Sequence, residues 1–263
     1  VKLAKKLTRG LSGFVNAILR SVIREQDSIG VEDLASNDIE VISFIYNIPL
    51  WLIDLWMGEF GRDKTEDLCA WFNQQPKLTA RINTILIDIP QCLTLLKEQG
   101  WDVSQDSNYK DIIYINSHRG SLEKSDAVIK GYITFMDKAS MLVARLVNPQ
   151  PGERVLDCCA APGGKSMYMA ALMDNTGSLM SCDIHEHKIA LMESNAQRLG
   201  ISIVQTKVQD ATELPSAWKS YFDRVLVDVP CSGLGILQKK LDMRWRKDES
   251  TLSELPPLQL AIL

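Results

Sequence analysis

The segment VLDCCAAPGGK, residues 155–165, decides the fold class of this chain. It begins with a short apolar run that ends in Asp157, which predicts a buried strand, and it continues with a turn into a helix. Small residues and a proline make up that turn: Ala160, Ala161, Pro162, Gly163 and Gly164. A ligand can lie directly against such a backbone, and the first N–H groups of the helix are free to bind it. The alternative is a tight turn without a ligand, and the Gly-x-Gly-x-x-Gly pattern of NAD-binding proteins is absent from the segment.

Strands and helices alternate on the carboxyl side of this segment. Apolar runs predict strands at residues 154–157, 178–183, 201–207 and 224–228, and helical periodicity predicts helices at 166–173 and 187–199. Elements that alternate with short links are typical of an α/β fold with a parallel, doubly wound sheet and helices on its faces.

The amino-terminal part has a different pattern of apolar residues. Helical spacing of apolar residues predicts one amphipathic helix at residues 3–24 and several short helices within 32–75. A small α+β segment follows, with strands expected at 80–87, 111–115 and 131–136 and helices at 91–100 and 138–147.

Composition places the chain among ordinary globular proteins. Of its 263 residues, 46% are hydrophobic and 24% charged, which excludes disordered, collagen-like and coiled-coil classes. The charge-free stretch at residues 41–53 is too short to span a bilayer, so no membrane partner is expected. The amino terminus lacks an apolar signal core, and six cysteines with two adjacent do not form a disulfide framework. We therefore expect a cytoplasmic protein.

Charge is unevenly distributed along the amino-terminal part. Residues 1–24 carry six lysines and arginines and no acid, whereas residues 25–70 carry eleven acids against Arg62 and Lys64. A basic block of this kind suits a polyanion such as RNA, because lysine and arginine make the phosphate contacts. On charge alone, a solvated helix surface is the more frequent explanation.

Three aspartates follow three of the predicted strands. Asp183 ends a strand 19 residues after Gly164, Asp210 follows the next strand, and Asp228 ends the one after. In dinucleotide-type folds, a carboxylate about 20 residues beyond the glycines hydrogen-bonds ribose hydroxyls. Because the carboxyl ends of parallel strands share one edge of the sheet, we expect these acids to lie together at a ligand site.

A second motif, DVPCSGLG at residues 228–235, places a thiol just beyond a strand end. Pro230 and Gly233 predict an exposed turn around Cys231, where a thiol can act as a nucleophile or handle protons. A buried, inert cysteine is the usual alternative. Metal binding by Cys182, His185 and His187 is disfavoured, because the spacing does not match a structural zinc site. We expect no metal.

Together these motifs resemble the RNA cytosine-5 methyltransferases, and among them those of bacterial small-subunit ribosomal RNA. The resemblance rests on DCCAAPGGK (157–165), CDIHEHKIALMESNAQRLG (182–200), VQDA (208–211) and DRVLVDVPCSGLG (223–235). Earlier segments also resemble that family: GFVNAILR (13–20), NIPLWLIDLW (47–56), ARINTILID (80–88) and ITFMDKASMLVARLV (133–147). The resemblance implies a Rossmann-like catalytic domain at 131–263, an RNA-binding intermediate domain at 28–130 and the end of a NusB-like helical domain at 1–27.

The resemblance also implies roles for single residues. The backbone of Cys159, Ala160, Ala161, Pro162, Gly163, Gly164 and Lys165 would hold the methionine part of S-adenosylmethionine. Asp183 would bind the ribose hydroxyls, and Asp210 would lie beside the adenine. Asp228 would face the methyl donor and the cytosine, and Cys231 would assist the final elimination. In this family the nucleophile is a different cysteine, in a Thr-Cys-Ser motif.

No Thr-Cys-Ser motif occurs in residues 1–263, and no cysteine follows Cys231. We therefore expect a chain truncated at both ends, with an incomplete sheet and its principal nucleophile beyond Leu263. The first hypothesis is a monomeric RNA cytosine-5 methyltransferase, with Cys231 as nucleophile in one variant. The second is a non-catalytic RNA-binding or assembly fragment that retains partial S-adenosylmethionine binding. A small-molecule methyltransferase would explain neither the Pro-Cys thiol nor the RNA-binding segments.

Overall fold

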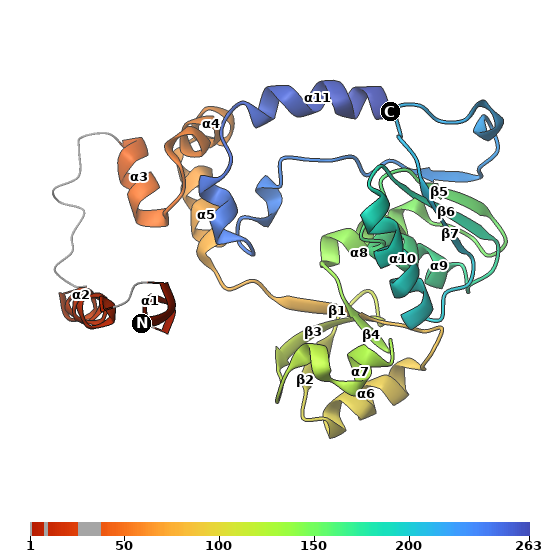
Figure 1. Cartoon of the computed structure of the whole chain (residues 1–263), viewed down its shortest axis with the longest axis horizontal. Helices are drawn as coiled ribbons and strands as arrows, with labels where there is room; N and C mark the ends of the chain where they lie inside the picture. Colours follow the sequence, from red (N-terminus) through yellow and green to blue (C-terminus); the bar gives the residue numbers. More distant parts are fainter. Residues whose placement is uncertain (1, 8–9, 26–37) are drawn as a thin grey trace. The chain divides into compact units, whose positions relative to one another are not determined.

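The structure is a computed structural model that describes residues 2–7, 10–25 and 38–263. The chain forms two compact units, and Figure 1 traces both along the sequence. The first, the helical unit, comprises Val1–Gln74 and Leu234–Glu249. The second, the two-sheet unit, comprises Gln75–Gly233 and Ser250–Leu263. Residues 234–249 were expected in the same domain as the parallel sheet, yet they belong to the helical unit.

Short helices make up the first part of the helical unit. They are α1 (Lys2–Leu7), α2 (Ser12–Glu25), α3 (Asp38–Tyr46), α4 (Leu50–Phe60) and α5 (Arg62–Asn73). The single helix expected at residues 3–24 is wrong, because Gly10 lies in a turn between α1 and α2 with a φ of 88°. A residue without a Cβ adopts this left-handed conformation at little cost. The short helices expected within 32–75 are confirmed from residue 38 on, and residues 32–37 lie outside the described part.

Aromatic and aliphatic side chains from α3, α4 and α5 form the core of the helical unit. Trp56 and Phe72 stack with their ring centres 5.5 Å apart, and Leu237 from the late segment is fully buried in the same cluster. Among the helices of the described part, none is long and apolar enough to cross a membrane alone. Parts of α3 and α4 pass that criterion only together, and they are bent by 117°.

Arg244 fixes the late segment to the helices of this unit. Its side chain is buried at 2% exposure, within the short helical turn Leu241–Trp245. The guanidinium donates hydrogen bonds of 2.8–3.4 Å to the carbonyl oxygens of Tyr46, Asn47, Phe72 and Leu237 and to Oδ1 of Asn73. One buried cation therefore satisfies acceptors from three parts of the unit, which explains why residues 234–249 pack there.

An antiparallel sheet opens the two-sheet unit. Its strands are β1 (Leu78–Ile82), β2 (Asp102–Gln105), β3 (Ile112–Ser117) and β4 (Ile133–Phe135), in the order β2-β3-β1-β4. Helices α6 (Ile89–Glu98) and α7 (Asp126–Ile129) bury Cys92, Leu96 and Ala127 against it. The segment 131–136, which was assigned by sequence to the catalytic domain, contributes β4 to this sheet.

A parallel sheet follows, as expected for an α/β protein. Its strands are β5 (Arg154–Asp157), β6 (Ser178–Asp183), β7 (Val204–Val208) and β8 (Arg224–Leu226), in the order β7-β6-β5-β8. Helices α8 (Lys138–Val147), α9 (Gly164–Leu172) and α10 (Glu186–Arg198) accompany it, and a last helix, α11, spans Thr251–Ile262. The expected fold class, α/β with a parallel, Rossmann-like sheet, is confirmed.

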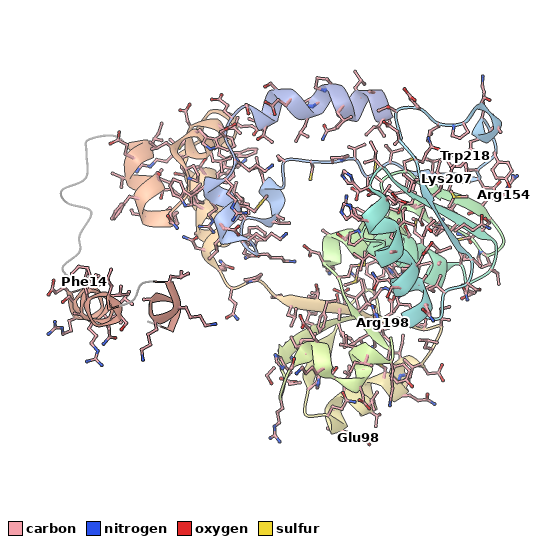
Figure 2. All side chains as sticks on the ribbon, viewed as in Figure 1. Phe14, Glu98, Arg154, Arg198, Lys207 and Trp218 are labelled. Atoms are coloured by element: carbon pink, nitrogen blue, oxygen red, sulfur yellow. The ribbon has the colours of Figure 1, made fainter. Side chains whose placement is uncertain are left out.

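The two faces of the parallel sheet are covered differently. Val155 and Leu179 pack with the buried side chains of α8, α9 and α10. On the other face, Leu156 packs in a smaller cluster with Trp218 and Ile262, from the loop before β8 and the end of α11. Lys207 covers the Trp218 ring, with its Nζ 4.7 Å from the ring centre; both are labelled in Figure 2.

Candidate functional site

The carboxyl ends of the four parallel strands lie at one edge of the sheet. The register pairs Asp157 with Ser181 and with Leu226, and it pairs Asp183 with Val208. Asp210 and Asp228 each follow the end of their strand by two residues. The acids that the sequence placed at strand ends therefore share this edge, which is the position where open α/β sheets bind ligands.

The glycine-rich turn after β5 is fixed to both neighbouring strands. The N–H of Cys158 donates to the carbonyl oxygen of Leu226 in β8 at 3.0 Å, and that of Ala160 donates to Cys182 in β6 at 2.7 Å. Gly163 caps α9 with a φ of 94°, and a Cβ there would lie 3.2 Å from Met192. Glycine is needed at this position for both reasons. No side chain caps α9, so its first N–H groups remain available to a ligand.

A cavity of about 250 Å³ opens beside this turn. It brings together three of the predicted site residues, Cys159, Asp183 and Asp210. Its other lining residues come from the turn, the loops after β6, β7 and β8, and helices α10 and α11: Cys158, Ile184, His185, Lys188, Gln209, Ala211, Thr212, Pro230, Leu258 and Ile262. Asp228, Cys231 and the Ala160–Lys165 part of the turn do not line this cavity.

Asp183 is held in a defined orientation at the cavity wall. Its side chain is 9% exposed, its Oδ1 accepts a hydrogen bond of 2.9 Å from the N–H of His185, and Lys188 Nζ lies 3.3 Å away. This backbone bond fixes the carboxylate where β6 turns into α10. An anchored carboxylate with spare acceptor positions can bind a pair of hydroxyl groups.

Asp210 lies across the cavity in the loop after β7. Its Oδ1 accepts hydrogen bonds from the N–H and the hydroxyl of Thr212, at 2.9 and 2.7 Å. These bonds, the hydroxyl bond first, lower the pKa of Asp210 because they stabilise the ionised form. The cavity therefore has a negatively charged group at each of two adjacent loops.

Asp157 lies beneath the turn and is 1% exposed. The hydroxyl of Ser166 donates to its Oδ2 at 2.7 Å. Burial raises the pKa of this carboxyl to about 6, since the charged form loses its hydration, and the Ser166 bond opposes that shift. No pattern in the sequence distinguishes Asp157 from the other strand-end acids in this way.

Lys165 and Asp228 bind each other. The Nζ of Lys165, at the start of α9, donates a hydrogen bond to Oδ2 of Asp228, two residues after β8. The side chains are 23% and 42% exposed, so the pair lies at the surface of the edge. Two sequence motifs that are 63 residues apart are therefore joined by one ion pair.

Cys231 lies in an exposed turn, as its proline and glycine neighbours predicted. Of the six cysteines, all within the described part of the chain, it is the exposed one, Cys159 is half-buried and the other four are buried. Gln259 of α11 donates from Nε2 to the carbonyl oxygen of Pro230 at 2.9 Å. This bond links the Pro-Cys turn to the helix that also lines the cavity.

Several residues of the site gave no local signal in the sequence. Lys188 lies five residues beyond Asp183 and pairs with it, a spacing that only the start of α10 explains. Leu258 and Ile262 reach the cavity from α11, which contains Pro256 and Pro257 and was not expected as a helix. In the described ranges 2–7, 10–25 and 38–263, no group of three or more His, Cys, Asp or Glu side chains could hold a metal ion.

Two sequence profiles of known proteins match the chain. The sequence profile described as "16S rRNA methyltransferase RsmB/F" matches residues 144–263. The profile described as "Methyltr_RsmF/B-like, ferredoxin-like domain" matches residues 48–120. The first match contains the parallel sheet and the cavity, and the second contains strands β1, β2 and β3.

A curated relative and two solved structures resemble most of the chain. The "Probable ribosomal RNA small subunit methyltransferase B" of Bacillus subtilis is 34% identical over 97% of this chain and 56% of its own length. The crystal structure of PH0851 has 30% identity and a TM-score of 0.79, and the match covers 86% of this chain and 51% of that one. A methyltransferase homologue from Pyrococcus horikoshii, 22% identical with a TM-score of 0.75, shares the fold over 87% of this chain and 72% of its own.

The chain spans about half the length of the curated relatives that it matches. The two profiles match successive parts of the chain, and the alignment with the Bacillus subtilis relative covers 97% of it. The strand-end acids and the glycine-rich turn lie inside the first profile. The chain is therefore similar, over most of its length, to the RsmB/F 16S rRNA methyltransferases.

Proposed function

We propose that this chain forms the donor-binding and RNA-binding parts of an enzyme that transfers a methyl group from S-adenosylmethionine to C5 of a cytosine in 16S ribosomal RNA. The observation that carries the proposal is the cavity at the sheet edge, where Asp183 and Asp210 lie beside the glycine-rich turn. The similarity to the RsmB/F profile and to a relative named as a ribosomal RNA small subunit methyltransferase supports ribosomal RNA as the substrate. The choice of C5 rests on the motif resemblance.

The residues of the cavity suit S-adenosylmethionine chemically. Asp183 is anchored by the His185 N–H and has acceptor positions left for ribose hydroxyls, and Asp210 would lie beside the adenine. Gly163 and Gly164 leave their backbone open, so Cys159–Lys165 would hold the methionine part. The cavity of about 250 Å³ is slightly smaller than the usual small-molecule site of roughly 300–1,000 Å³, which suits the nucleoside part of the donor alone.

The bound donor would supply a methyl group on a positively charged sulfur. Cytosine C5 is a weak nucleophile, and a thiolate that adds to C6 makes C5 an enamine carbon that can take this methyl group. Asp228 would hold a proton at N3 of the cytosine, where negative charge develops during the addition. Afterwards a base removes the C5 proton and the thiolate leaves C6, which restores the ring.

Two thiols have roles in this scheme. The adding thiolate would come from the Thr-Cys-Ser motif of the family, which is not among residues 1–263, and Cys231 would assist the elimination. The exposed position of Cys231 beside Pro230 supports contact with an RNA base. The target cytosine must leave its stack to reach the site, so the substrate would be a loop or an accessible single strand.

Donor binding is tested by calorimetry with S-adenosylhomocysteine, which lacks the reactive methyl group. We expect binding by this chain, and Asp183→Asn should weaken it at least about tenfold because ribose bonds to a carboxylate are lost. Asp54→Asn, the same change at an exposed position of α4, should leave the affinity unchanged. No binding by the unmodified chain would refute the donor assignment.

Methyl transfer is tested with a form of the protein that includes the Thr-Cys-Ser motif. Labelled S-adenosylmethionine and 16S rRNA should give 5-methylcytidine after digestion of the RNA. Transfer to another base or another position would refute the C5 assignment. With 5-fluorocytidine RNA, a covalent complex that survives Cys231→Ala supports the two-thiol scheme, and its loss identifies Cys231 as the nucleophile. Donor and RNA binding without any transfer would favour a non-catalytic assembly role.

A further inference from the structure

Asp111 connects the antiparallel sheet to two helices of the parallel sheet. It directly precedes β3, and its side chain is 12% exposed. Its Oδ2 accepts a hydrogen bond of 2.6 Å from the hydroxyl of Tyr168 in α9, and its Oδ1 accepts one of 2.5 Å from Nη2 of Arg145 in α8. One carboxylate therefore ties both helices to the strand that follows it.

Arg81 adds a buried positive charge to the same contact. It lies on β1 at 0% exposure, and none of its three guanidinium nitrogens has a hydrogen-bond partner among the described residues. Its guanidinium lies 5.2 Å from the centre of the Tyr168 ring. Burial lowers the pKa of Arg81 to about 10, and Tyr168 and Asp111 oppose that shift. The cation is therefore stabilised mainly by the ring and the carboxylate, which makes Tyr168 part of an electrostatic cluster.

Tyr168 is close to the glycine-rich turn along α9. It lies four residues after Gly164, which corresponds to about 6 Å along a helix. Met136, which follows β4, lies 3.9 Å from the position that a Cβ on Gly164 would occupy. The antiparallel sheet thus contacts α9 at its first residue and again one turn later.

A second contact fixes the end of α10. Asn83, fully buried after β1, donates from Nδ2 to the carbonyl oxygens of Gly131 and Leu199 at 3.0 and 2.9 Å. Arg198, labelled in Figure 2, donates to the carbonyl oxygen of Val128 at 3.0 Å. Helix α10 begins three residues after Asp183. Both helices that start at the candidate site are therefore anchored on the antiparallel sheet.

We propose that Asp111 and Tyr168 are positioning residues of the donor site, so that affinity for the donor depends on the antiparallel sheet. The identity of the ligand rests on the proposed function. The hydroxyl–carboxylate bond holds α9 one turn after its first residue and so fixes the direction of the helix, whose free N–H groups lie beside Gly163. Because coupling between two sites is reciprocal, a ligand in the cavity must also strengthen the attachment of the antiparallel sheet.

Calorimetry with S-adenosylhomocysteine at 10 °C tests the positioning role. Tyr168→Phe keeps the ring beside Arg81 and removes the hydroxyl that binds Asp111, and we expect affinity about three- to tenfold weaker. Asp111→Asn should act in the same direction. Tyr132→Phe removes a hydroxyl beside β4 without removing any of these bonds, and it should bind like the unmodified chain. Lower melting temperatures with unchanged affinity in Tyr168→Phe and Asp111→Asn would overturn the proposal.

Hydrogen exchange of the unmodified chain separates this inference from the proposed function. With S-adenosylhomocysteine, we expect slower exchange at residues 159–165 and also at residues 78–83 and 131–135 of the antiparallel sheet. Slower exchange at 159–165 alone would overturn the coupling and leave the donor site intact. No binding at all would overturn the proposed function, and the inference with it.

Discussion

The Nζ of Lys165 donates a hydrogen bond to Oδ2 of Asp228 and thereby joins the start of α9 to the loop after β8. Neither residue is deeply buried, and the pair is one of the few links between the glycine-rich turn and the Pro-Cys turn among the described contacts. Its contribution to stability is small for that reason, since exposed ion pairs stabilise by about 0.2–1 kcal/mol. Its main effect is on orientation: it holds the Asp228 carboxylate toward α9.

Lys165→Met should therefore separate ligand binding from stability. We expect the free energy of unfolding in urea to fall by less than about 1 kcal/mol. The affinity for S-adenosylhomocysteine should fall about tenfold, because a charge-assisted bond at the site is lost. Lys207→Met, on the edge strand β7, is the matched control and should bind normally. Equal affinities of the two variants would contradict this role of the ion pair.

Gly163→Ala and Gly164→Ala should differ in stability although they are adjacent. Gly163 has a φ of 94°, and a Cβ there lies 3.2 Å from Met192, so we expect a loss of about 1–3 kcal/mol in urea unfolding. At Gly164 no positive φ is present, and a Cβ meets Met136 only at 3.9 Å, an ordinary contact distance. Gly164→Ala should stay within about 0.5 kcal/mol of the unmodified chain. The reverse order of stability would show that the turn has a different backbone.

The pH dependence of stability should report on Asp157. Burial raises the pKa of this carboxyl from 3.8 to about 6, so between these values the folded chain binds more protons than the unfolded chain. This contribution therefore favours folding at acidic pH and is lost as the pH rises through 6. Asp157→Asn removes it, and an amide oxygen can still accept the Ser166 hydroxyl bond.

The measurement compares the two proteins in urea at pH 4.5 and pH 7.5. The free energy of unfolding of Asp157→Asn, relative to the unmodified chain, should increase by about 2 kcal/mol between the two conditions. Other acids with lowered pKa values, such as Asp210 and Asp223, change the free energy of unfolding of both proteins equally with pH. Their contributions therefore cancel in the comparison. A difference that is constant with pH would mean that Asp157 titrates normally.

Alkylation by iodoacetamide at pH 8 should modify Cys231 first. Its thiol is exposed, whereas burial raises the pKa of the half-buried Cys159 to about 11. A thiol with that pKa has about one thiolate in a thousand at pH 8, and the thiolate is the reacting form. Mass spectrometry of the peptides should find a single early site, which Cys231→Ser abolishes. Early labelling of Cys159 would show that the turn opens readily.

Arg244→Met should destabilise the helical unit. It leaves four carbonyl oxygens and the Asn73 side chain without their buried donor, and we expect a loss of about 3–5 kcal/mol. Arg246→Met, two residues away at 73% exposure, should change stability by less than about 1 kcal/mol. Hydrogen exchange of α4 and α5 measures the effect directly. Unchanged exchange there would mean that Leu237 alone holds the late segment.

The parallel sheet could be predicted closely from sequence because its central strands are buried. The expected bounds are confirmed for helix α8 and strands β5 and β6. Apolar runs mark the two strands, and the Pro-Gly hinge between α8 and β5 marks where one element ends and the next begins. Strand β2 was missed because Asp102–Gln105 has one apolar residue and lies at a sheet edge. Strand β2 forms because it pairs with β3, and the local sequence pattern does not indicate such a tertiary contact.

Only part of the candidate site could be predicted from the sequence. Asp183 and Asp210 could be placed together because strand ends of a parallel sheet share an edge, and the cavity confirms that they do. Helix α11 could not be predicted, because Pro256 and Pro257 disfavour a helix at these positions. The role of Arg244 depends on acceptors as far as 198 residues away in the chain, and the connection of Asp111 to α9 is equally non-local.

Residues 234–249 impose an order on how this protein matures during synthesis. The helices of the helical unit leave the ribosome early, but Leu237 and Arg244, which complete their core, are made only after the whole antiparallel sheet and all four parallel strands. Until then Trp56 and Phe72 lack part of their apolar covering, and several backbone carbonyls lack their donor. The helices that are made before both sheets thus complete their core only after the sheets have been synthesised, and a nascent chain stalled before residue 234 would expose this surface to chaperones.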